Sequence, residues 1–143
     1  MASYRTEITS TRPQADLFLY MARFSNAAEW DPGVSGAEEL NPGPPALGST
    51  YRLGVRSLGR SIPLDYRIIE FVAPRRVVLR AENHFLRSTD VIEVQPGPGD
   101  GSTLTYDATL TLTGLLSPFS PLLGRPLRRL GDRAANGLRA TVG

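Results

Sequence analysis

Apolar and polar residues alternate along five segments between Ser49 and Leu112, which is the pattern of β-strands with one buried face. The segments read STYRLGVR, IPLDYRI, RVVLRAEN, LRSTDVIEVQP and TLTYDATLTL, and the loops between them are short. Short loops between alternating strands indicate an antiparallel meander. The alternating segment 2–11 predicts a further strand, and VSGAEEL, residues 34–40, a short one.

The remaining segments have helical spacing. Residues 13–24 place apolar side chains near helical intervals, and Pro13 suits a first helical turn. Ser25 can cap a second short helix, NAAEW, which Pro32 ends. The tail predicts a long amphipathic helix that becomes regular from about Pro126. Its expected inner face consists of Phe119, Leu122, Leu123, Leu127, Leu130, Ala134 and Leu138, and arginines dominate the opposite, solvent-exposed face.

These elements predict a single α+β domain, residues 1–143, with six or seven antiparallel strands. Burial of all apolar faces requires the long helix to lie across the concave face of a curved sheet. One register keeps the apolar faces together. It pairs Val55 with Ile62, Leu53 with Leu64 and Tyr51 with Tyr66. Its central row continues from Tyr66 through Ala81, Asp90 and Ala108, and the next row contains Leu64, Asn83, Ser88 and Leu110.

The composition excludes several kinds of chemistry. The chain has no Cys, one His, and sixteen basic residues that are all Arg. Thiolate nucleophiles, lysine Schiff bases and multi-histidine metal sites are therefore ruled out. Because these metal ligands are missing, we expect no metal, and because no phosphate-binding glycine motif is present, we expect no cofactor. The net charge of +2 gives no support for a nucleic-acid partner.

The expected location in the cell rests on two features that the sequence lacks, a membrane span and a signal peptide. No apolar run approaches the roughly 20 residues of a membrane span, so we expect no stable membrane insertion. The first residues, MASYRTE, contain no apolar signal-peptide core, which favours a cytoplasmic protein. The oligomeric state stays open, with a dimer among the options.

Asp90 is the exception in the predicted strand LRSTDVIEVQP, because it falls on the same face as Ile92 and Val94. A buried carboxylate without a partner costs several kcal/mol. Three explanations are open: Asp90 pairs with an arginine of the long helix, it reaches water at the open end of the sheet, or it contacts a ligand in a cavity. In the third case it forms a polar cluster with Tyr66, Asn83 and Ser88, the usual make-up of a ligand pocket with apolar walls.

The whole chain resembles the START-like superfamily, also called SRPBCC or helix-grip, and specifically its polyketide cyclase/dehydrase and lipid-transport branch. The residues that carry the resemblance are FSNAAEWDPGV, GPPALGSTYRL, APRRVVL, STDVIEV, GDGSTLTYDATLTLTG and RRLGDRAANGL. The resemblance implies a cavity between the sheet and the long helix that holds an apolar molecule. It implies no shared catalytic motif.

Three functions are compatible with these observations. The first is binding of a hydrophobic small molecule such as a lipid, polyketide or terpenoid. The second is an aromatase/cyclase or dehydratase that uses Asp90 and Tyr66 as acid–base groups. The third is an accessory or regulatory subunit whose core is filled. The candidate ligand contacts are Trp30, Tyr51, Tyr66, Ala81, Asn83, Ser88, Asp90, Tyr106, Ala108, Leu127, Leu130 and Ala134.

Overall fold

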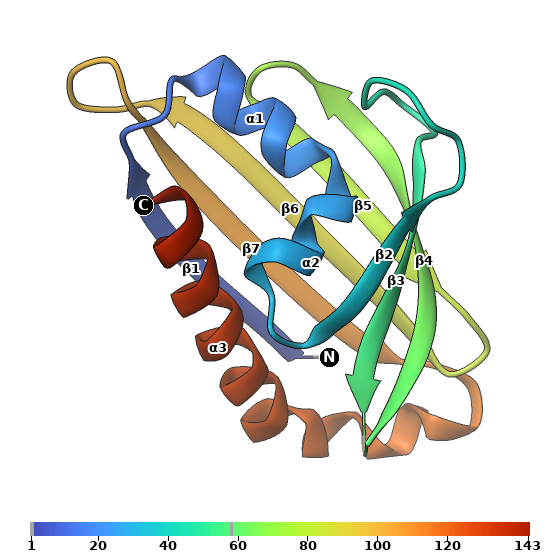
Figure 1. Ribbon diagram of the computed structural model, residues 1–143. Coiled ribbons are helices and arrows are strands. Elements are labelled where there is room, and N and C mark those ends of the chain that lie inside the picture. Colours follow the sequence, from blue (N-terminus) through green and yellow to red (C-terminus); the bar gives the residue numbers. More distant parts are fainter. Residues whose placement is uncertain (1, 58) are drawn as a thin grey trace.

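The computed structural model describes residues 2–57 and 59–143, and within these ranges seven antiparallel strands form one curved sheet. The strand order is β1-β7-β6-β5-β4-β3-β2 (Figure 1). The strands are β1 (Ala2–Ser10), β2 (Val34–Glu39), β3 (Thr50–Ser57), β4 (Arg60–Val72), β5 (Arg76–Glu82), β6 (Leu86–Pro96) and β7 (Ser102–Leu112). The predicted meander is confirmed, although Leu58 of the predicted β3–β4 turn lies outside the described residues.

The helices lie on the concave side of the sheet. Two short helices and a 3-10 turn follow the first strand, as α1 (Gln14–Ala22), η1 (Phe24–Asn26) and α2 (Ala27–Trp30). A 3-10 segment, η2 (Gly114–Leu123), then leads into α3 (Gly124–Val142). In Figure 1, α1 and α2 lie in front of β5, β6 and β7, and α3 runs along β1. This arrangement confirms the predicted helix-grip fold.

The predicted register is correct for most of the sheet. Tyr51 pairs with Tyr66, Leu53 with Leu64, and Asp90 with Ala108. The expected pairing of Ala81 with Asp90 is wrong, because Ala81 pairs with Ser88 and Asp90 pairs with Leu79. The error is two residues, so every side chain keeps its face.

A tighter turn causes this shift. The expected pairing of Ala81 with Asp90 requires a four-residue loop, HFLR, at residues 84–87. The backbone instead closes from Asn83 to Leu86, with the Asn83 N–H donating to the Leu86 carbonyl at 3.0 Å. The side-chain oxygen of Asn83 also accepts the backbone N–H groups of Phe85 and Leu86. Asparagine commonly stabilises turns by such local bonds.

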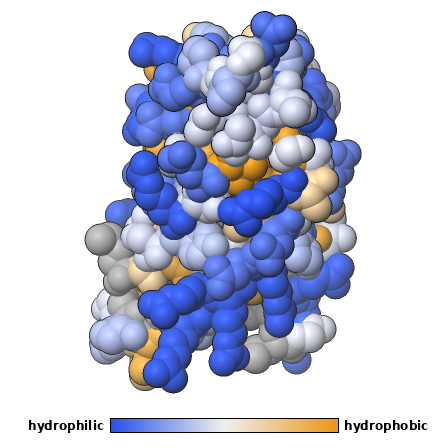
Figure 2. Space-filling model, turned by 90° about the vertical axis from the view of Figure 1, so that its left-hand side faces the viewer, coloured by the Kyte–Doolittle hydropathy of each residue, from blue (hydrophilic) through white to orange (hydrophobic). Residues whose placement is uncertain are grey.

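The inner face of the tail is shorter than predicted. Leu138 is buried, but Phe119 and Leu122 are 53% and 71% exposed. They belong to η2, where Pro118 and Pro121 prevent a regular α-helix, so helical spacing does not hold there. The side chain of Leu123 lies outside the described residues. Figure 2 shows the side of the molecule on which α3 and β1 lie, where hydrophilic residues predominate with smaller hydrophobic areas between them.

Candidate ligand-binding cavity

A cavity of about 310 Å³ lies between α2, α3 and the concave face of the sheet. Its size is at the lower end of the about 300–1,000 Å³ typical of small-molecule sites. Most of its walls are apolar, with residues from each bounding element. They include Ala27 and Trp30 of α2, Leu53 and Leu64 of β3 and β4, Ala108 of β7, and Leu127, Ala134 and Leu138 of α3.

A close contact between two helices fixes one wall of the cavity. An added Cβ at Gly137 of α3 would lie only 1.9 Å from the backbone oxygen of Trp30. Only glycine therefore allows α3 to approach the end of α2 this closely. Two small residues of α3 thus have different roles, since Gly137 permits helix packing and Ala134 lines the cavity.

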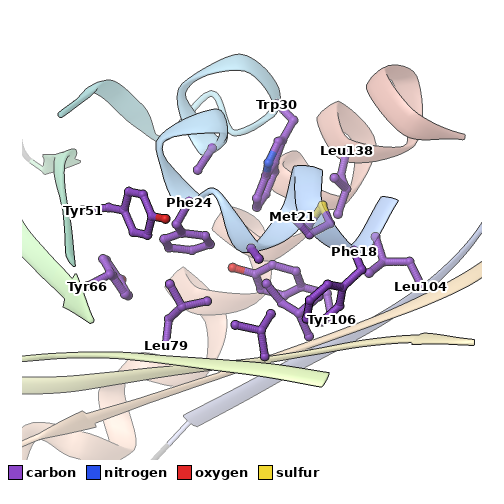
Figure 3. Close-up of a cluster of buried hydrophobic side chains, with 14 of the residues drawn as sticks. Phe18, Met21, Phe24, Trp30, Tyr51, Tyr66, Leu79, Leu104, Tyr106 and Leu138 are labelled. Carbon is purple, nitrogen blue, oxygen red and sulfur yellow. The ribbon is translucent and has the colours of Figure 1, made fainter. Parts of the chain in front are cut away.

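The main polar feature of the cavity is a buried pair formed by Asp90 and Tyr106. The Tyr106 hydroxyl donates to Oδ2 of Asp90 at 2.5 Å. Trp30 packs edge-on against the Tyr106 ring, with centroids 5.6 Å apart and planes at 74° (Figure 3). This geometry is a favourable one for aromatic pairs. Two hypotheses for Asp90, pairing with an arginine and contact with open solvent, do not hold. Asp90 is buried, and its side-chain donor among the described residues is Tyr106.

Burial changes the acid–base behaviour of this pair. Desolvation raises the pKa of Asp90 from 3.8 to about 7, and the hydrogen bond from Tyr106 opposes part of this effect. The negative charges of Asp31 and Asp107 raise it further. Desolvation also raises the pKa of Tyr106, as does the neighbouring Asp90. Asp90 therefore exchanges a proton near neutral pH, whereas Tyr106 stays protonated and can donate.

A second polar pair lies beside the first. The hydroxyls of Tyr66 and Ser88 are 2.9 Å apart and share one hydrogen bond. The Tyr66 ring packs edge-on against Phe24, with centroids 5.0 Å apart. Burial raises the pKa of Tyr66, so its hydroxyl stays protonated. We expected Tyr66 to reach toward Asp90, but its hydrogen bond goes to Ser88.

Asp31 contributes a second carboxylate to the cavity lining. It follows α2 directly, and its Oδ1 accepts the backbone N–H of Gly33 at 2.8 Å. Desolvation raises its pKa. Asp31 is not among the residues predicted from the sequence to contact a ligand. The signal available was the WDPG stretch, because an Asp before Pro-Gly at the end of a helix is held by local turn bonds beside the preceding aromatic residue.

The structure brings together most of the predicted contacts. The cavity is lined by Trp30, Tyr66, Ser88, Asp90, Tyr106, Ala108, Leu127, Leu130 and Ala134. Tyr51 and Ala81 are buried in the core and do not line it. The predicted placement of Asn83 in the polar cluster is wrong, because its side chain is exposed and bonded within the β5–β6 turn.

The structure also bears on metal binding and on membrane spanning. Within residues 2–57 and 59–143, no three His, Asp or Glu side chains are grouped as metal ligands. In the same part of the chain, no helix is long and apolar enough to cross a membrane.

The arrangement of a curved sheet, a long C-terminal helix and an apolar cavity defines a START-like, helix-grip protein. Solved structures with this fold include a START superfamily protein from Mycobacterium smegmatis, at TM-score 0.71 and 17% identity, with 98% of this chain and 94% of that chain covered. A protein from Thermus thermophilus matches at TM-score 0.74 and 17% identity, with 96% and 94% covered. The di-domain aromatase/cyclase of the steffimycin biosynthetic pathway matches at TM-score 0.70 and 12% identity, with 96% of this chain and 50% of that chain covered.

The family model described as polyketide cyclase / dehydrase and lipid transport matches residues 1–143. The chain therefore belongs to this family. No curated protein matches the chain. The solved structures share the fold of this chain at low sequence identity. The family match identifies this fold as one that binds hydrophobic ligands.

Proposed function

We propose that the protein binds a hydrophobic small molecule, such as a lipid, polyketide or terpenoid, in the cavity between the sheet and α3. The observation that carries the proposal is an apolar cavity of about 310 Å³ with a few polar groups at defined positions. A filled core, as expected for an accessory subunit, would leave no such space.

The energetics agree with a binding role. Burial of ten methylene groups contributes roughly 8 kcal/mol before the costs of association. After those costs, micromolar affinity is a reasonable expectation. No catalytic residue is required for this function.

A cavity-filling substitution tests the proposal. Ala134 lines the cavity from α3, and Ala140 on the same helix is exposed. We expect N-phenyl-1-naphthylamine, an apolar fluorescent dye, to bind the wild-type protein and the Ala140→Phe variant. Ala134→Phe should weaken binding at least tenfold without loss of the fold by circular dichroism. Equal dye affinity in all three proteins would contradict the proposed site.

One observation favours a second candidate function, polyketide cyclisation or dehydration. Asp90, whose pKa is about 7, lies in the cavity beside a protonated tyrosine. At neutral pH such a carboxylate can take a proton from a carbon next to a ketone. Once Asp90 is protonated it no longer needs the Tyr106 hydroxyl as a donor, and that hydroxyl can donate toward the developing negative charge. Tyr106 thus replaces Tyr66 as the proposed partner of Asp90.

The test of this second function is chemical. A poly-β-ketone mimic incubated with the protein should lose water or form a ring, with a rate that rises through pH 7 as Asp90 ionises. Asp90→Asn should abolish this rate and retain dye binding. If the mimic bound without any change in its mass or absorbance, the cyclisation or dehydration function would be wrong and the binding function would stand.

A further inference from the structure

The polar groups of the cavity have a strong bias toward hydrogen-bond acceptors. The charged residues in its lining are Asp31, Asp90 and Arg56. Arg56 is exposed, and its Nε donates to the backbone oxygen of Pro32 at 3.2 Å, so it lies at the rim. Inside the cavity the charged groups are therefore the two carboxylates, which only accept hydrogen bonds when ionised.

The hydrogen bonds that the polar groups already form explain this bias toward acceptors. An ionised carboxylate offers about four lone-pair positions. Asp90 accepts one side-chain hydrogen bond from Tyr106, and Asp31 accepts one backbone N–H from Gly33. The proton of Tyr106 is already donated to Asp90, and one hydroxyl proton of the Tyr66–Ser88 pair is used between them. The hydroxyls of Thr6 and Thr109 also line the cavity, and each offers one donor and two acceptor positions. More acceptor than donor positions therefore remain for a ligand.

The electrostatics of the cavity act in the same direction. The negative charges of Asp31 and Asp107 raise the pKa of Asp90. Among the described residues, neither Asp90 nor Asp31 forms a salt bridge. A third negative charge placed in this desolvated space would be repelled by both.

We propose that the cavity selects apolar molecules whose polar end donates hydrogen bonds, such as a hydroxyl, phenol or amine, over those that end in a carboxylate. The proposal rests on the proposed binding function and names the ligand class of the same site. The donor group of the ligand would lie at Asp90, and its apolar body would extend between the sheet and α3.

A set of ligands with the same chain length provides the test. Trp30 is the single tryptophan of the chain and lines the cavity, so its fluorescence reports occupancy. Decanol, decylamine and decanoate are titrated at pH 8, with decanol below its solubility limit and the two charged ligands below their critical micelle concentrations. We expect decanol and decylamine to bind at least tenfold more tightly than decanoate.

Variants link the preference to the carboxylates. Asp90→Asn should reduce the ratio of decylamine to decanoate affinity about tenfold, and Asp31→Asn should reduce it in the same direction. Asp100→Asn is the control, because Asp100 is exposed in the β6–β7 turn and absent from the cavity lining. This variant should leave the ratio unchanged.

The possible results separate the two proposals. If no member of the set and no apolar dye binds, the proposed function itself is wrong. If the ligands bind but decanoate binds as tightly as decanol, the proposed preference is overturned and the binding function stands. The preference is also overturned if Asp90→Asn and Asp31→Asn both leave the ratio unchanged.

Discussion

Asp90 should make the stability of the fold depend on pH in a way that its amide variant removes. The pKa of its carboxyl rises from 3.8 to about 7 on folding, chiefly through desolvation. Between these values the folded protein binds more protons than the unfolded chain, so the free energy of unfolding falls as pH rises. At 1.36 kcal/mol per unit of pKa, the full penalty above pH 7 is about 4 kcal/mol.

The substitution Asp90→Asn isolates this effect. Asparagine has a similar shape, and its oxygen can still accept the Tyr106 hydroxyl, but it carries no charge to desolvate. We expect the variant to gain stability relative to wild type as pH rises, by about 3 kcal/mol between pH 4.5 and pH 8. Urea unfolding followed by circular dichroism at both pH values measures the change.

The control for this experiment is Asp100→Asn, at an exposed turn position. Its stability should follow that of wild type at both pH values. If the difference between Asp90→Asn and wild type were the same at pH 4.5 and pH 8, Asp90 would ionise like an exposed carboxyl. The account of a desolvated carboxylate in the cavity would then be wrong.

Two further substitutions test the pair and the wall of the cavity. Tyr106→Phe removes the hydrogen bond that lowers the pKa of Asp90. A hydrogen bond to a charged group contributes about 1.5–3 kcal/mol, so the pKa of Asp90 should rise by about one to two units; an unchanged titration of its carboxyl carbon by NMR would contradict this pairing. Gly137→Ala places a Cβ against the Trp30 oxygen, and overpacking should destabilise the fold by about 1–3 kcal/mol despite the better helix propensity of alanine. Gly124→Ala meets no atom within 4 Å and should show no such loss in thermal unfolding.

Local patterns along the chain were sufficient to predict the fold. Alternation with a period of two places Leu53, Leu64, Ile92 and Leu104 in the core, and all four are buried. The register of a hairpin depends on its turn as well as on this alternation. The error at β5–β6 arose because a tight turn held by Asn83 and a longer loop preserve the same faces.

The candidate site was predicted less completely, because side-chain partners depend on contacts between distant segments. Asp90 stood out as a carboxylate on an apolar face, but its partner Tyr106 belongs to the next strand, and the sequence pattern pointed to Tyr66 instead. Asp31 comes from the segment after α2, and its WDPG turn predicts local bonds but not that this segment covers the cavity. Exposure of Phe119 follows from the prolines of η2, which interrupt helical spacing.

The most direct test of the central claim is native mass spectrometry of the freshly purified protein, followed by extraction and identification of any bound molecule. We expect a reproducible apolar adduct in the wild-type protein and in Ala140→Phe, and its loss in Ala134→Phe. An adduct that contains a hydroxyl, phenol or amine would also support the proposed ligand class. If the wild-type protein carried no adduct and bound neither the dye nor any of the ten-carbon ligands, the claim that this cavity holds a hydrophobic molecule would be contradicted.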